Sequence, residues 1–134
     1  MRLLLDTHAW LWFHLGDPRL SQTAKGHILD PANSKFVSPA SFWEISIKIS
    51  LGKYVLNVPH AQFMHDSIAG QGFKILDITP RHTELVATLP FPVIGGNEHR
   101  DPFDRLLISQ AQVEGMSIVS DDGKFPAYAV PIVW

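Results

Sequence analysis

Short apolar segments that alternate with longer helical ones are the feature that most limits how this chain can fold. Apolar runs of strand length occupy residues 2–5, 35–38, 73–78 and 116–120. Strands of a parallel sheet have this nearly continuous apolar character, because helices cover both faces of the sheet. We therefore predict an α/β fold with a short, mostly parallel central sheet, formed by residues 1–134 as a single domain.

Start and stop signals divide the rest of the chain into helices and loops. Ser21 and Thr79 are predicted helix N-caps, Pro80 takes a first helical position, and Gly52 ends a helix. Residues 91–100 are predicted to form a loop, and residues 128–134 to carry a final short strand. The predicted helices cover residues 7–15, 21–30, 39–53, 59–70, 79–89 and 101–115.

The composition excludes several classes of function. The chain has no cysteine, which rules out disulfides, thiol catalysis and cysteine-ligated zinc. With 13 acidic and 11 basic residues the net charge is −2, so binding to nucleic acid would need a local basic patch or a metal ion. No apolar run approaches the roughly 20 residues that span a bilayer. We expect a cytoplasmic protein that does not contact membranes.

Acidic residues stand where predicted strands end and predicted helices begin. Taken singly, each has a structural explanation: Asp6 and Asp101 suit helix N-caps, and Asp104 suits a first helical turn. The stretch Ser41–Glu44 fits a capping box, and residues 121–123 fit a turn. The acids at these positions are Asp6, Glu44, Asp101, Asp104, Asp121 and Asp122.

Together these acids would meet at one edge of a parallel sheet, because the carboxyl ends of its strands lie side by side. Two carboxylates about 5 Å apart repel by about 3 kcal/mol at an effective dielectric constant of about 20, and a divalent cation relieves that repulsion. Carboxylate oxygens suit Mg²⁺ or Mn²⁺ rather than a soft metal. Such a cation activates water and neutralises a phosphate, so the pattern indicates metal-assisted phosphodiester hydrolysis.

Four segments of the chain also carry a resemblance to a known family. LLLDTHAWLW, SPASFWEISIKISLGK, HRDPFDRLLISQA and IVSDD, in this order, resemble the PIN-domain ribonucleases of the VapC toxin type. The motifs S-x-W-E-I-x-I-K and H-R-D-P-F-D-R-L-L are the specific ones, and the resemblance extends over essentially the whole chain. It implies a PIN-like three-layer α/β/α sandwich and a Mg²⁺- or Mn²⁺-dependent endoribonuclease, the toxin of a toxin–antitoxin system.

The resemblance also implies a set of catalytic, metal-binding acids. Asp6 matches the aspartate after the first strand, and Glu44 matches the glutamate of the following helix. The third acid is Asp104, with Asp101 as the alternative ligand, because D-P-F-D offers both. The fourth is Asp122, and Asp121 would line the rim.

Four neighbouring polar residues are candidates for binding substrate. Thr7 would orient Asp6 or a ligand water, or else only complete the helix N-terminus. Arg100 and Arg105 flank acids, where each would hold a phosphate with two hydrogen bonds or simply balance charge. Lys48 would do either, and it also forms an i,i+4 pair with Glu44.

The histidines and aromatic residues have ordinary structural explanations. We expect His8 and His99 to be surface residues without a catalytic role. Trp10 and Phe13 are three residues apart on one helix face and are predicted to enter the core. Trp12 would fall on another face, where an exposed ring would stack on a base or join an interface.

The resemblance implies partners as well as an activity. It implies an RNA substrate, a homodimer, and a small antitoxin whose tail inserts an Arg or an aromatic side chain into the acidic cleft. DNA would be bound only indirectly, through the antitoxin. The alternatives are a non-catalytic PIN-like binding module and an Asp-dependent phosphatase. The phosphatase is disfavoured because Asp6-Thr7-His8 lacks the second aspartate of a D-x-D motif.

Overall fold

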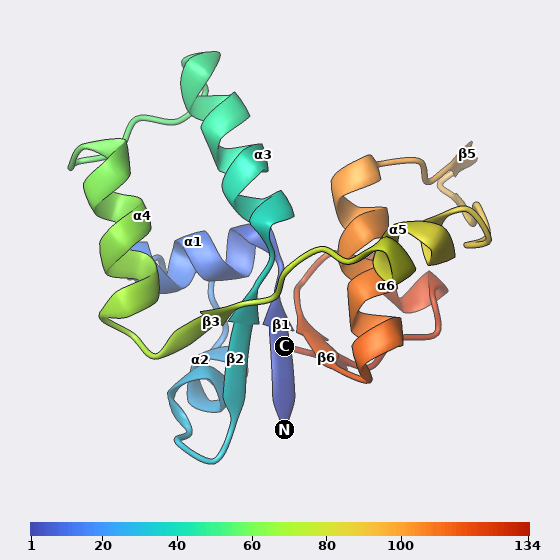
Figure 1. The fold of residues 1–134 in the computed structure, drawn as a ribbon, viewed down its shortest axis with the longest axis horizontal. Helices are drawn as coiled ribbons and strands as arrows, with labels where there is room; N and C mark the ends of the chain where they lie inside the picture. The colour runs from blue at the N-terminus through green and yellow to red at the C-terminus, as the bar shows by residue number, and fades with distance from the viewer.

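A five-stranded parallel sheet forms the centre of the computed structural model, which describes residues 1–134. The strand order is β3-β2-β1-β6-β7, so β1 lies in the middle (Figure 1). The register aligns Leu4 with Phe36 on one side and with Ile118 on the other. The strands are β1 (Arg2–Leu5), β2 (Ser34–Val37), β3 (Phe73–Ile75), β6 (Ser117–Val119) and β7 (Ile132–Val133).

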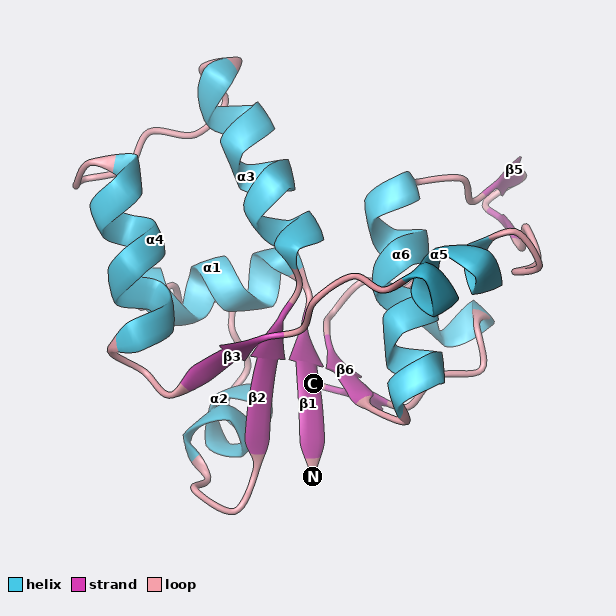
Figure 2. Ribbon diagram, viewed as in Figure 1, coloured by secondary structure: helices cyan, strands magenta, loops and turns pink.

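Six α-helices connect these strands, as the sequence predicts (Figure 2). Strand β3 is shorter than predicted, and the predicted loop at 91–100 contains the antiparallel hairpin β4 (Val93–Ile94) and β5 (Asn97–Glu98). No helix is both long and apolar enough to cross a membrane. The helices are α1 (Thr7–Leu15), α2 (Gln22–Leu29), α3 (Pro39–Ser50), α4 (His60–Ala69), α5 (Pro80–Val86) and α6 (Pro102–Glu114), with a 3₁₀ turn η1 (Phe125–Ala127).

Consecutive leucines of β1 supply both layers of the core. Leu3 and Leu5 pack into one apolar cluster with residues of α1, α2, α3 and α4, while Leu4 packs into a second cluster with α6 and η1. All three leucines are fully buried. Because side chains alternate across a strand, one short apolar run holds helices on both faces of the sheet. The prediction of an α/β/α sandwich is confirmed.

Helix starts follow the sequence with one correction. Asp6, Ser21 and Asp101 cap their helices through their side chains, as predicted. The capping box at Ser41–Glu44 is wrong, because α3 begins at Pro39, as its predicted range does. Its N-cap is Ser38, whose Oγ accepts a hydrogen bond from the Ala40 amide at 3.1 Å. Ser41 is therefore a buried residue inside the helix.

Trp10 and Trp12 of α1 are both buried, whereas Phe13 is only partly buried. Trp10 is fully buried, which confirms its place in the core. Trp12 is only 8 % exposed, with Trp134 against its ring and the Arg19 guanidinium 4.8 Å from the ring centroid. Trp12 is therefore not the exposed ring that base stacking or an interface would require.

Candidate metal centre

An acidic cavity of about 240 Å³ lies at the carboxyl edge of the sheet. It brings together all five acids that the sequence selects as metal ligands, although they come from four separate parts of the chain. No apolar side chain lines it. The lining residues are Asp6, Thr7, His8, Glu44, Lys48, Asp101, Asp104, Asp122 and Lys124.

Asp6 is held at the junction between the central strand and the first helix. Its amide donates to the Val119 carbonyl at 3.1 Å, which continues the pairing of β1 with β6. Its Oδ1 accepts a hydrogen bond from the Ala9 amide at 2.7 Å and so caps α1. The capping explanation and the site explanation are both satisfied, because the second carboxylate oxygen takes no part in the cap.

Glu44 and Lys48 occupy successive turns of α3 beside the cavity. The Lys48 Nζ lies 3.7 Å from Glu44 Oε2, as the i,i+4 spacing predicts. The Lys48 ammonium also lies 5.3 Å from the centre of the Tyr54 ring. Thr7 reaches α3 from the opposite side, where its hydroxyl donates to Ser41 Oγ at 3.1 Å instead of bonding Asp6.

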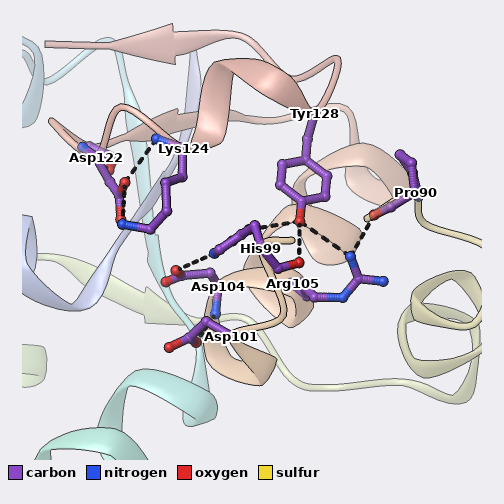
Figure 3. Close-up of polar contacts among 9 residues, drawn as sticks. Pro90, His99, Asp101, Asp104, Arg105, Asp122, Lys124 and Tyr128 are labelled. Atoms are coloured by element: carbon purple, nitrogen blue, oxygen red, sulfur yellow. Dashed lines mark hydrogen bonds and ion pairs between the residues drawn. The ribbon is translucent and has the colours of Figure 1, made fainter. Parts of the chain in front are cut away.

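Asp101 and Asp104 enter the cavity from the first turn of α6. Asp101 is the N-cap, and its Oδ1 accepts a hydrogen bond from the Asp104 amide at 3.0 Å. Asp104 Oδ2 lies 3.0 Å from Nε2 of His99 (Figure 3). Both carboxylates line the cavity, so the structure leaves open which of them binds a metal directly.

Asp122 is presented by a turn after β6. Its amide donates to Ser120 Oγ at 3.0 Å, and its Oδ1 accepts a hydrogen bond from the Lys124 amide at 2.9 Å. The Lys124 ammonium lies 3.1 Å from the same carboxylate, and this contact raises the pKa of Lys124. Asp121 is exposed outside the cavity, yet its charge still acts on Asp6.

Burial raises the pKa of Asp6 and so disfavours its ionised form. The pKa of Asp6 is raised from 3.8 to about 7, chiefly because burial removes hydration, with smaller contributions from the charges of Asp121 and Asp104. Hydrogen bonds from the Ser120 hydroxyl and the Ala9 amide lower the pKa but do not offset burial. A positive charge in the cavity would therefore stabilise the ionised form of Asp6.

Asp104 is affected in the same direction. Its pKa rises to about 6, first because the group is buried and second because Asp101 carries a like charge nearby. The hydrogen bond with His99 opposes this rise, whereas the charge of Asp122 adds to it. Two of the five carboxyl groups, Asp6 and Asp104, therefore have raised pKa values that a nearby positive charge would lower.

The donor set fits a hard divalent cation. Carboxylate oxygens surround the cavity and no sulfur ligand is present, which is the chemistry that Mg²⁺ and Mn²⁺ prefer. No group of three or more acidic or histidine side chains is already arranged to hold a metal ion. Binding of a cation would therefore draw the carboxylates closer together. The raised pKa values of Asp6 and Asp104 mean that the ionised forms of these two groups would be stabilised most by the added positive charge.

The two predicted phosphate-binding arginines lie away from the cavity. Arg105 is only 4 % exposed, and its guanidinium donates to the carbonyls of Pro90 at 2.6 Å and Leu89 at 3.2 Å. It cannot reach a phosphate in the acidic cavity, so this prediction is corrected: Arg105 fixes the segment before the hairpin. Arg100 is exposed and donates from Nε to Glu98 Oε2 at 2.9 Å.

One lysine and two histidines have a closer relation to the site than the sequence predicts. The sequence gives no signal that places Lys124 in the site, yet it lines the cavity as Lys48 does. His8 also lines the cavity, and burial lowers its pKa below 6.5. His99 is 6 % exposed, not a surface residue. Its place two residues before the D-P-F-D motif is the only local signal, since its partner Tyr128 lies far along the chain.

Residues 3–131 match the family model of the PIN domain. The chain belongs to the PIN domain family. This confirms the resemblance found in the four sequence segments. No curated protein sequence matches the chain.

Several solved structures have the same fold. VapBC2 from Rickettsia felis, bound to a promoter DNA fragment, aligns with a TM-score of 0.68 at 17 % identity over 98 % of this chain and 97 % of that one. FitAcB from Neisseria gonorrhoeae aligns with a TM-score of 0.64 at 19 % identity over 97 % and 95 %. VapBC-1 from nontypeable Haemophilus influenzae gives 0.65 at 13 % identity over 98 % and 96 %. This PIN domain therefore shares its whole fold with them.

Replacing Asp6 by Asn should stabilise the metal-free PIN domain above neutral pH. Because folding raises the pKa of Asp6, its destabilising charge is absent below about pH 4, grows as the pH rises, and is complete above about pH 7. The rise from 3.8 to about 7 corresponds to at most about 4 kcal/mol of unfolding free energy, which the neutral amide recovers while still capping α1. Urea unfolding in EDTA at about pH 8 and about pH 4 measures the difference.

The gain should appear at the higher pH and shrink toward zero at the lower one. Asp30→Asn, at the exposed end of α2, is the matched control and should change the unfolding free energy by less than about 0.5 kcal/mol. A loss of stability for Asp6→Asn at about pH 8 would mean that the fold stabilises the charged carboxylate, contrary to this assignment.

Proposed function

We propose that this PIN domain is a metal-dependent endoribonuclease, the cytoplasmic toxin of a VapBC-type toxin–antitoxin system. The observation that carries the proposal is the acidic cavity, in which five carboxylates and two lysines gather with no apolar lining. RNA phosphates are anions, so a site built from acids needs a bound cation to accept them. The fold shared with VapBC2 and VapBC-1 supports the same assignment.

In this proposal the acids hold Mg²⁺ or Mn²⁺. Asp6, Glu44 and Asp104 are the main ligands, with Asp122 in support. The cation supplies neutralising charge to the scissile phosphate and lowers the pKa of a bound water. We favour Asp104 over Asp101 as the direct ligand, because Asp104 is the more buried of the two and its raised pKa means that a bound cation would stabilise its ionised form.

The lysines of the cavity are the groups that would contact the RNA backbone. Lys48 and Lys124 each have an ammonium beside a carboxylate, at 3.7 Å from Glu44 and 3.1 Å from Asp122. A cation that binds those carboxylates would leave the ammonium groups available as point charges for phosphate oxygens. Thr7 donates its hydroxyl hydrogen to Ser41, so its oxygen would accept a hydrogen bond from a ligand water and orient it.

A groove along α1 supports an antitoxin as partner. Two cavities of about 230 and 290 Å³ share Leu15 and Leu56 as lining residues, and the first shares His8 with the acidic cavity. Val55 in this groove is 91 % exposed. We propose that an apolar antitoxin segment lies here and extends a basic side chain into the acidic cavity. DNA binding by such a complex would belong to the antitoxin.

A separate apolar surface supports a homodimer. Trp43 is 65 % exposed, and its ring packs edge-on against Phe103 with 5.3 Å between centroids. Monomers rarely leave such an aromatic surface uncovered, so we propose that a second copy covers it. The two rings line a groove of about 600 Å³ between α3 and α6, with Pro39, Ala40, Ile47, Ile78, Pro102 and Leu106.

Purified protein free of antitoxin should cleave structured RNA only in the presence of Mg²⁺ or Mn²⁺. Asp6→Asn removes one ligand charge while keeping the helix cap, so we expect cleavage to fall by at least about 100-fold. EDTA should abolish cleavage by the parent. Gel electrophoresis of end-labelled total RNA measures the rates, and Asp30→Asn should cut like the parent.

Other outcomes of this experiment have distinct meanings. Equal cutting by the parent and Asp6→Asn would point to a contaminating nuclease. If the parent cuts nothing, Mn²⁺ calorimetry decides between the alternatives. Metal binding without cleavage would leave a non-catalytic binding module, and no metal binding would reject the acidic site.

Val55→Asp should free the toxin from its antitoxin without changing RNA cleavage. A charge in the apolar groove would oppose burial of the antitoxin segment, so growth should stay arrested when the variant is expressed with the antitoxin that protects against the parent. Val93→Asp, at another exposed position in the hairpin, is the control and should be neutralised normally. Neutralisation of Val55→Asp would place the antitoxin on another surface.

Trp43→Asp should convert the dimer to a monomer. Losing a central aromatic contact typically costs more than about 2 kcal/mol, so the dissociation constant should rise by at least about 30-fold. Light scattering should give twice the chain mass of 15.0 kDa for the parent and for Leu29→Asp, an exposed apolar residue of α2. A monomeric parent would contradict this proposal.

A further inference from the structure

A buried series of hydrogen bonds continues from Asp104 into the protein (Figure 3). His99 Nε2 lies 3.0 Å from Asp104 Oδ2, and His99 Nδ1 lies 2.7 Å from the Tyr128 hydroxyl. Arg105 Nη1 donates to the same hydroxyl at 3.2 Å. His99, Tyr128 and Arg105 are all almost fully buried, and none of them lines the acidic cavity.

The chemistry of these groups gives the series one direction. A guanidinium only donates, so Arg105 makes the Tyr128 oxygen an acceptor. The Tyr128 hydrogen then goes to His99 Nδ1 at 2.7 Å in preference to the His99 carbonyl at 3.4 Å. A neutral imidazole that accepts at Nδ1 carries its proton on Nε2, which faces the Asp104 carboxylate.

The series begins at a rigid anchor. The two terminal nitrogens of Arg105 donate to the carbonyls of Pro90 at 2.6 Å, Leu89 at 3.2 Å and Val86 at 3.4 Å. Its guanidinium also lies 4.0 Å from the centre of the Phe91 ring. A planar cation held by three carbonyls and one ring has no freedom to turn, so the Tyr128 hydroxyl is held as well.

We propose that His99 is a positioning residue that donates from Nε2 to Asp104 Oδ2 and so keeps the other carboxylate oxygen directed to the cation. The inference rests on the proposed function, because it assumes that Asp104 is a metal ligand. A carboxylate held in this way loses the freedom to rotate out of the site. Outer-shell partners of this kind commonly change metal affinity by about 10- to 100-fold.

The direction of the series is tested by NMR of the full-length, metal-free protein with ¹⁵N-labelled histidine. We expect His99 to be the Nε2-protonated tautomer. Tyr128→Phe keeps the ring and removes the donor to Nδ1, so the Nδ1 resonance should shift toward that of an unbonded nitrogen. A His99 protonated at Nδ1 alone in the parent would overturn the proposal, because that imidazole has no hydrogen on Nε2 to donate to Asp104.

The effect on the site is tested by Mn²⁺ titration calorimetry. His99→Leu removes the donor and should weaken Mn²⁺ binding about 10- to 100-fold, whereas His99→Gln returns an N–H near Nε2 and should restore most of the affinity. His82→Leu is the matched control. His82 is fully buried, and its Nε2 lies 2.9 Å from Glu114, outside the cavity, so Mn²⁺ affinity should not change.

Thermal unfolding separates positioning from folding. His99→Leu and His82→Leu should both lower the melting temperature, but only His99→Leu should lose Mn²⁺ affinity. Equal Mn²⁺ affinity in the parent and a folded His99→Leu, or no difference between the Leu and Gln variants, would overturn the proposal. If His99→Leu does not fold, Tyr128→Phe should still weaken Mn²⁺ binding by up to about tenfold, and parent-like affinity in it would overturn the proposal.

The outcomes also separate this inference from the proposed function. A parent that binds Mn²⁺ and cuts no RNA would reject the ribonuclease and leave the positioning role standing. A parent that binds no Mn²⁺ would overturn both.

Discussion

The junction at Asp6 is the constraint on which the rest of the structure depends. Its amide extends the pairing between β1 and β6, and its carboxylate caps α1 one residue later. Strand and helix therefore meet without a turn, and the carboxylate cannot relax into water. The consequence is a buried acid with a pKa near 7, placed where other strand ends and helix starts bring their own acids.

The lysines and the arginine near the cavity have different roles, which follow from the chemistry of their side chains. Lys48 and Lys124 keep flexible ammonium groups beside carboxylates, where a charge can move to meet a cation or a phosphate. Arg105 is used as a structural anchor, because one guanidinium satisfies several buried carbonyls at once. Hydrogen bonds through Tyr128 and His99 connect Arg105 to Asp104, so a buried, fixed group is linked to a carboxylate of the cavity.

Sequence patterns located the helices and strands where the signal was local. Proline at the first turn of α5 and α6, and capping by Asp6, Ser21 and Asp101, are contacts within a few residues. Predictions of local structure failed where the outcome depends on contacts between residues far apart in the sequence. The predicted range of α3 gives its start at Pro39 correctly, but the capping box at Ser41 is wrong, because Ser41 is a buried partner of Thr7. The hairpin within 91–100 carried no alternating apolar pattern that would have predicted it.

The sequence by itself determined which acids form the candidate site, because strand ends, helix caps and family motifs are readable within short segments. Only the tertiary structure decided which positive groups face those acids. Lys124 lines the cavity whereas Arg105 is buried behind it, and His99 is held by Tyr128 from a distant segment. The physical reason is that burial and hydrogen-bond partners depend on packing between segments, which no local spacing specifies.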